Sequence, residues 1–146
     1  MKYLLLGLLF IIAGCQVDTI ATSGVDKTNY DLIDYNTELK VKVEYGNLPD
    51  IHTFTSAWTR IQECSGLSAY TPPFIVVVED IAGRPDALYF EDGVILIQSR
   101  SLRYSSLLRH EMLHHLLSAN GMYKESNTHT SDLFDDCVPG TTIRNQ

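Results

Sequence analysis

The sequence is short of positive charge. It holds 11 Lys and Arg residues against 18 Asp and Glu residues, for a net charge of −7 at pH 7, and the basic residues form no cluster. Loss of an N-terminal segment carrying Lys2 would make this −7 − 1 = −8. Surfaces that bind nucleic acid depend on patches of Lys and Arg, so the composition argues against a nucleic-acid partner.

The sequence also lacks an apolar run long enough to cross a bilayer. The run from Tyr3 to Ile12 is shorter than the roughly 20 residues that a membrane-spanning helix needs. It follows Lys2 and precedes small residues, which is typical of a secretory signal peptide over residues 1–14. We therefore expect the protein to be exported.

The end of that segment, Ile12-Ala13-Gly14-Cys15, resembles a bacterial lipobox. The resemblance implies cleavage before Cys15, attachment of lipid to Cys15, and a membrane anchor in the bacterial cell envelope. Gln16 stands where an Asp would resemble an inner-membrane retention signal, which implies the outer membrane in a host with two membranes. The alternative is a plain signal peptide that is cut nearby, with Cys15 incidental.

Cysteine is scarce as well, with three residues in the chain. If Cys15 carries lipid, Cys64 and Cys137 remain, and an even pair in an exported domain predicts one disulfide. The alternative is two independent buried thiols. Residues 16–37 show no sustained hydrophobic period, so we interpret 15–37 as a lipidated N-terminus with a flexible tether. The remaining residues, 38–146, suffice for one compact domain.

The hydrophobic pattern of residues 38–146 predicts an α+β fold. Residues 38–46 alternate like a half-buried strand, and a helix follows between Asp50 and Gly66. Residues 73–80 form an apolar, β-branched run that is typical of a central strand. Residues 87–98 predict a hairpin around Asp92-Gly93. A second helix is expected from about 102 to 118 or 119, with a loop-rich tail after it.

The second predicted helix carries His110-Glu111-Met112-Leu113-His114, an H-E-x-x-H pattern. Residues four apart share one face of a helix, so the two imidazoles could converge on one Zn²⁺ ion. The alternative is that these histidines only pack in the core, with Glu111 in a salt bridge to Arg109 or another cation. Burial of a carboxylate and imidazoles without partners is costly, which favours a metal.

A catalytic zinc site keeps three protein ligands and one open position, so a third ligand is expected downstream. His129 is the favoured residue, because neutral imidazole is a good zinc ligand. Glu125 is the second choice, since sites with two His and one Glu also occur. Asp132, Asp135 and Asp136 are further candidates.

The motif segment is similar to the active-site helix of the zincin metallopeptidases. It departs from the metzincin extension, because Leu117 and Asn120 occupy the positions of that extension's Gly and His. A wider match resembles small bacterial lipoproteins that carry the H-E-x-x-H motif. That match covers the motif helix and Trp58, Cys64, Gly66, Gly121, His129, Phe134 and Cys137.

The resemblance implies a small zincin-like domain with a mixed sheet and two main helices, and a zinc-dependent peptidase that uses Glu111 as general base. It also implies an extended peptide or protein substrate beside an edge strand, for which residues 94–98 are the candidate unless they are ordinary core. Tyr123, His115 and Arg109 are candidates for oxyanion stabilisation. His115 could instead support a metal ligand through a hydrogen bond or pack in the core. His52 is expected at the surface.

Two other functions fit the same residues. The chain could be a non-catalytic lipoprotein that uses the motif helix as a metal-binding or interaction element, or it could scavenge metal at the envelope. Only hydrolysis requires Glu111. A domain of about 109 residues leaves little room for a subdomain that walls a peptidase cleft, so a protein partner could complete the cleft.

Overall fold

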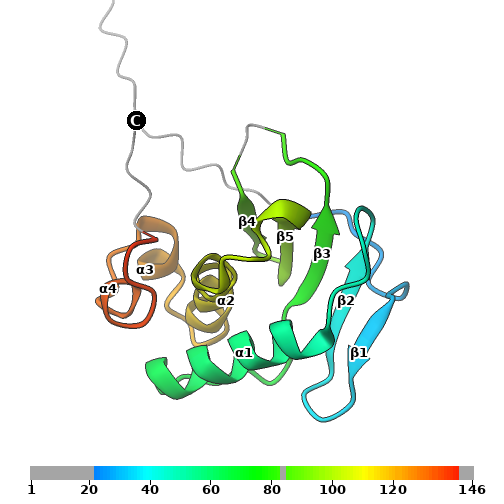
Figure 1. Cartoon of the computed structure of the whole chain (residues 1–146). Coiled ribbons are helices and arrows are strands. Elements are labelled where there is room, and N and C mark those ends of the chain that lie inside the picture. Colours follow the sequence, from blue (N-terminus) through cyan, green and yellow to red (C-terminus); the bar gives the residue numbers. More distant parts are fainter. Residues whose placement is uncertain (1–21, 83–84, 142–146) are drawn as a thin grey trace, which may run out of the picture.

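The computed structural model describes residues 22–82 and 85–141. A five-stranded sheet has the order β1-β2-β3-β5-β4 (Figure 1). Its strands are β1 (Leu32–Asp34), β2 (Leu39–Val43), β3 (Phe74–Val78), β4 (Ala87–Phe90) and β5 (Val94–Gln98). The middle pairs β2–β3 and β3–β5 are parallel, whereas both outer pairs are antiparallel. The predicted α+β class with a mixed sheet is confirmed.

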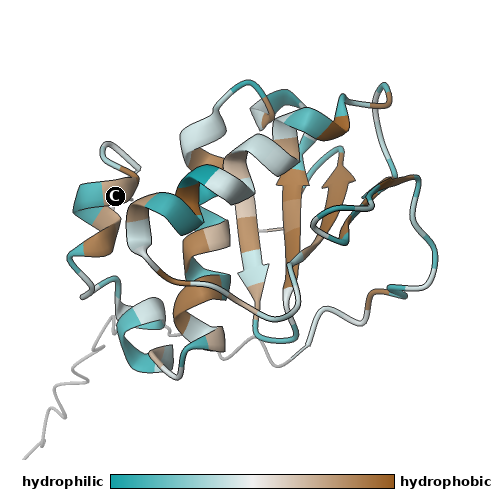
Figure 2. Cartoon of the chain, turned by 90° about the horizontal axis from the view of Figure 1, so that it is seen from below, coloured by the Kyte–Doolittle hydropathy of each residue, from teal (hydrophilic) through white to brown (hydrophobic). Residues whose placement is uncertain are grey.

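Strand β3 lies at the centre of the sheet and is covered on both faces, as its apolar sequence predicted. Ile75 and Val77 belong to the core on the helix side, and Phe74 and Val76 pack into a smaller cluster on the other side. Figure 2 shows the strands as the hydrophobic centre of the molecule. Strand β2 ends at Val43, earlier than expected, and Tyr45 is exposed.

Helix α1 (Ile51–Ser65) begins and ends where the sequence predicted. The Asp50 carboxylate accepts from the His52 amide at its start, and Gly66 ends it in the left-handed conformation with φ 67°. The left-handed conformation costs glycine little, because it has no Cβ. Trp58 is buried against the sheet, as expected.

Helix α2 (Ser105–Ala119) follows a short 3₁₀ turn, η1 (Ser99–Ser101), so it starts three residues later than predicted. Residues 110–117 are all buried, because α2 lies between the sheet and the C-terminal segment (Figure 1). The helix therefore has apolar neighbours on opposite sides, which explains its lack of a single polar face.

The C-terminal tail is more regular than the sequence predicted. It contains the short helices α3 (Tyr123–Thr128) and α4 (Leu133–Cys137). The predicted disulfide joins Cys64, near the end of α1, to Cys137 at the end of α4. These short helices depend on packing and the cross-link, since isolated helices of this length are unstable in water.

The hairpin around Asp92-Gly93 is present, but the predicted edge strand is wrong. Residues 94–98 form β5, which lies between β3 and β4, and β4 is the edge strand on this side. Chain order alone could not show this, because β5 pairs back onto β3 and leaves β4 outside. Ile95 and Ile97 are fully buried as a consequence.

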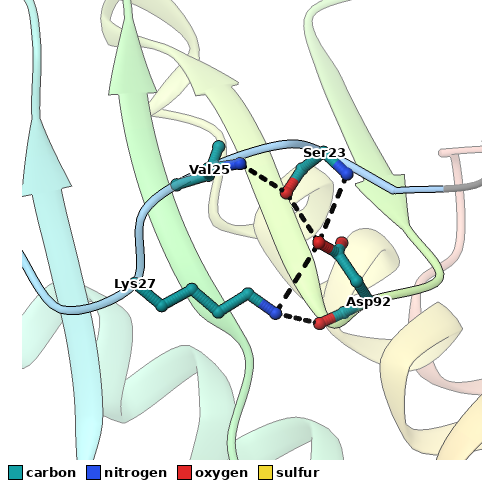
Figure 3. A network of polar contacts seen from close by, with 4 residues as sticks. All are labelled: Ser23, Val25, Lys27 and Asp92. Atoms are coloured by element: carbon teal, nitrogen blue, oxygen red, sulfur yellow. Dashed lines mark hydrogen bonds and ion pairs between the residues drawn. The ribbon is translucent and has the colours of Figure 1, made fainter.

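The tether prediction needs correction over residues 22–37. Strand β1 pairs with β2, and the preceding segment crosses the outer face of the sheet. There the Ser23 amide and hydroxyl and the Lys27 ammonium all bind Asp92 in the β4–β5 turn (Figure 3). Val25 packs against the apolar cluster below. The segment lacks a hydrophobic period, and its sequence alone therefore does not indicate that it packs on the sheet.

Cys15 lies outside the described residues. Within the described ranges, no helix is both long and apolar enough to span a membrane.

Candidate metal centre

Three imidazoles meet beside helix α2. His110 and His114 lie one turn apart on that helix, and their Nε2 atoms are 3.2 Å apart. His129 comes from the end of α3, and its Nε2 lies 3.1 Å from that of His110. These three residues form a group that could hold a metal ion. The helical spacing of four accounts for the first two residues, and the chain reversal after α2 brings the third.

The chain path to His129 depends on two left-handed residues. Gly121 ends α2 with φ 76°, and α3 then runs back along the motif helix. His129 itself ends α3 with φ 53°, which is uncommon for a residue with a side chain. The other sequence candidates are exposed and lie outside the histidine group; they are Glu125, Asp132, Asp135 and Asp136.

Hydroxyl groups fix the tautomers of the two helix histidines. Thr141 Oγ1 lies 3.0 Å from Nδ1 of His110 and donates its own proton to the Val138 carbonyl. The His110 Nδ1 must therefore be the donor, which leaves a lone pair on its Nε2. Ser126 Oγ lies 3.0 Å from Nδ1 of His114 and donates to the His114 carbonyl, with the same result.

Convergent lone pairs at this spacing suit a cation. Without one, two Nε2 acceptors would face each other at 3.2 Å with no proton between them. Tetrahedral zinc with Zn–N distances of about 2.0–2.1 Å separates its nitrogen ligands by roughly 3.3–3.4 Å. The spacings of 3.1 and 3.2 Å are close to this value. The residues present thus fit a three-histidine metal site.

The surroundings keep these imidazoles neutral. Burial, with a smaller contribution from the charge of His129, lowers the pKa of His110 to about 4. Burial also lowers the pKa of His114 well below its usual value and lowers that of His129. Neutral imidazole is the form that binds metal, so protons compete little with a cation near neutral pH.

Phe134 supports the histidines from the side of α4. Its ring centroid lies 5.0 Å from that of His110, 4.9 Å from His114 and 4.7 Å from His129. The disulfide at Cys137 holds α4 to α1 three residues further on. His110 and His114 are buried while His129 is exposed, so the site opens to solvent on the His129 side.

Glu111 lies on the β4 side of α2 and is 6 % exposed. Burial raises the pKa of Glu111 to about 8, and a hydrogen bond from the Tyr89 backbone amide opposes this shift. In the described part of the chain no ion pair involves Glu111, which removes the expected alternative of a salt bridge to Arg109. A buried carboxyl with a raised pKa beside a metal site has the character of a general base.

Tyr89 of the edge strand joins this side of the centre. Its ring stacks on His114 with 6.0 Å between centroids and meets His115 edge to face at 5.9 Å. His115 points away from the three-histidine group and binds the Thr71 carbonyl, 2.8 Å from its Nε2. That contact favours the packing role over oxyanion stabilisation. His52 is exposed, as expected.

Sequence reasoning missed Ser126, Thr141 and Tyr89. The first two are ordinary hydroxyl residues in a tail that has several, and no spacing distinguishes them. Tyr89 could have been predicted as a neighbour of the histidines only if β4 had been recognised as the edge strand. Arg109 is partly buried and Tyr123 is 38 % exposed, and neither belongs to the metal-binding group.

In comparisons with known proteins, no family profile, no curated protein and no solved structure matches the chain.

Proposed function

We propose that this protein is a zinc-dependent peptidase of the zincin type, anchored to the bacterial cell envelope through lipid on Cys15. The observation that carries the proposal is the convergence of three Nε2 atoms, of which those of His110 and His114 are held as lone pairs, beside a buried Glu111. Three imidazoles and one open position are the ligand set of a hydrolytic zinc site.

The roles of the residues follow from this arrangement. His110, His114 and His129 would hold Zn²⁺, and Thr141 and Ser126 would orient the first two. Bound zinc lowers the pKa of a coordinated water and polarises a substrate carbonyl. Glu111 would act as the general base, taking up a proton at its buried carboxylate and giving it to the leaving amine. The Tyr89 amide keeps the Glu111 carboxylate oriented.

The edge strand β4 offers a place for an extended peptide. The Gln98 backbone amide donates to the Asp86 carbonyl. In the antiparallel β4–β5 pair, the backbone groups of every second β4 residue, Leu88 and Phe90, therefore turn toward β5. Those of Ala87 and Tyr89 consequently turn away from it. Because the Tyr89 amide binds Glu111, the Ala87 groups and the Tyr89 carbonyl are the ones left at the open edge. A peptide could pair with them while its carbonyl reaches the histidines next to Tyr89.

The test begins with metal content. A soluble form that starts at Gln16 keeps every described element and the disulfide. We expect one zinc per chain by mass spectrometry, lost in His129→Ala and retained in the matched Glu125→Ala variant. Absence of stoichiometric metal from the parent protein would overturn the proposal.

A peptidase screen then separates an enzyme from a metal-binding lipoprotein. Zinc-loaded parent protein should cleave peptides, and Glu111→Gln should retain zinc but lose hydrolysis by a factor of at least about 100, within the range of a lost general base. Zinc binding without any cleavage that depends on Glu111 would instead support the non-catalytic alternative.

A further inference from the structure

A cavity of about 660 Å³ lies beside the proposed catalytic centre, on the far side of Tyr89 from the three histidines. It is bounded by the β1–β2 region, the segment before β3, the β4–β5 turn and the end of α2. Its volume exceeds the space that one side chain needs. Flat and aromatic groups make up much of its wall, namely Tyr35, Pro72, Pro73, Phe74 and Tyr89. Such walls favour an aromatic ring.

Two residues of the wall carry buried acceptors without partners. The His115 Nε2 lies 2.8 Å from the Thr71 carbonyl, which can only accept, so Nε2 holds the ring proton and Nδ1 is an acceptor. This Nδ1 and Asp92 Oδ1 are buried and make no hydrogen bond within the described chain. Buried polar groups almost always have partners in the protein, in water or in a ligand, and only a hydrogen-bond donor can serve these two acceptors.

The charges around the cavity balance closely. Lys27 is paired with Asp92, and the wall also carries Lys40, Glu38 and Glu91. A strongly charged occupant of either sign would therefore meet like charge. A neutral group that carries a donor has no such penalty.

The cavity is continuous with the open edge of β4. That strand runs from Ala87 past Tyr89 to the turn at Glu91–Gly93, and both Tyr89 and the turn line the cavity. A peptide that pairs antiparallel with β4 and passes the histidines beside Tyr89 would carry its amino-terminal residues into the cavity.

We propose that this cavity binds a tyrosine or tryptophan side chain on the amino-terminal side of the cleaved bond. The assignment of a cleaved bond rests on the proposed peptidase function. Binding of a donor-bearing aromatic ring in the cavity does not depend on that function, and this binding can be measured in metal-free protein.

The first experiment uses p-cresol, the side-chain analogue of tyrosine, with 4-methylanisole as a matched probe that lacks the donor. In the metal-free soluble form, p-cresol should cause saturable shifts of the Thr71, Gly93 and Ser118 amides in two-dimensional NMR spectra. 4-Methylanisole should bind at least about tenfold more weakly, because it leaves the acceptors unpaired. Equal affinities, or shifts that do not saturate, would overturn the proposal.

Variants locate the binding. Ala119 is exposed at the end of α2 and lines the cavity, so Ala119→Trp should fill it and abolish p-cresol binding. Thr59→Trp places the same side chain on the exposed face of α1, away from the cavity, and should leave binding unchanged. Undiminished binding in a folded Ala119→Trp protein would contradict the assignment.

The second experiment uses zinc-loaded protein and peptides that differ only by Tyr or Phe at one position before the cleaved bond. We expect kcat/KM to favour Tyr by about tenfold in the parent, and Ala119→Trp to remove the preference. Equal use of both peptides would refute the substrate assignment. If the protein takes up no stoichiometric zinc when zinc is supplied but still binds p-cresol, the peptidase is refuted and the cavity remains a binding site.

Discussion

Ser126 and His114 hold each other through two hydrogen bonds: the Ser126 hydroxyl lies 3.0 Å from Nδ1 of His114 and 3.3 Å from its carbonyl oxygen. Helix α3 is thereby joined to the motif helix at the candidate metal site. The pairing orients the ring and directs the Nε2 lone pair toward the other two histidines.

Loss of either orienting hydroxyl should weaken metal binding. We expect Ser126→Ala and Thr141→Ala each to lower zinc affinity by about 10- to 100-fold, as measured by competition with a chromophoric chelator. Thr128→Ala is the matched control, because its hydroxyl binds the Lys124 carbonyl on the exposed side of α3. A similar loss in all three variants would contradict an orienting role.

Glu111 should make the stability of the metal-free protein depend on pH. Its pKa of about 8 in the folded protein exceeds the ordinary value of 4.5, so the folded state binds more protons between these values and loses stability as the pH rises. Glu111→Gln removes this loss. In urea unfolding, the free energy of unfolding of the variant relative to that of the parent should rise by on the order of 3 kcal/mol between pH 5 and pH 8.5.

Zinc provides the control for that measurement. A bound cation favours the charged carboxylate, so the pH-dependent difference between Glu111→Gln and the parent should shrink with zinc present. A difference that stays constant from pH 5 to pH 8.5 in metal-free protein would show that Glu111 has an ordinary pKa.

The disulfide should support both the fold and the metal site. It spans a sequence separation of 73, for which chain entropy gives about 4 kcal/mol of stabilisation. Replacing Cys64 and Cys137 with Ser should remove this and release α4, whose Phe134 contacts all three histidines. Zinc affinity measured in the folded double variant should fall, and an unchanged affinity would refute the link.

Close packing at the β4–β5 turn should make Gly93 sensitive to substitution. A Cβ at Gly93 would lie 3.2 Å from Cε1 of His115, and φ there is 81°. Gly121 has a similar φ of 76° but open space around it. Both alanine variants carry a backbone penalty, so Gly93→Ala should lose about 1 kcal/mol more than Gly121→Ala in thermal unfolding. Equal losses would show that the His115 contact adjusts freely.

The motif helix was predictable because its information is local. His110 and His114 share a helix face through their spacing alone, and Asp50 and Gly66 bound α1 through their own conformational preferences. His129 was predictable as a residue type suited to zinc. Its position depends on the left-handed backbone conformation of His129 itself, which no sequence pattern predicts.

The features that were missed depend on distant partners. Strand β1 has three residues and no period, so it exists only through pairing with β2. The exchange of β4 and β5 at the edge follows from parallel pairing between β3 and β5, and the hairpin sequence is compatible with either order. The hydroxyls of Ser126 and Thr141 acquire a role only when the tail folds against α2.

The attachment of the N-terminal segment to Asp92 limits how far the domain could stand from a membrane. Ser23 is the first of the described residues that is hydrogen-bonded to the sheet, and eight peptide links separate it from Cys15. Fully extended, they reach at most about 28 Å. If Cys15 carries lipid, the segment from Cys15 to Ser23 can span no more than roughly the width of the domain itself. The domain would then lie within about one molecular diameter of the bilayer. Only substrates within that distance of the membrane could reach it.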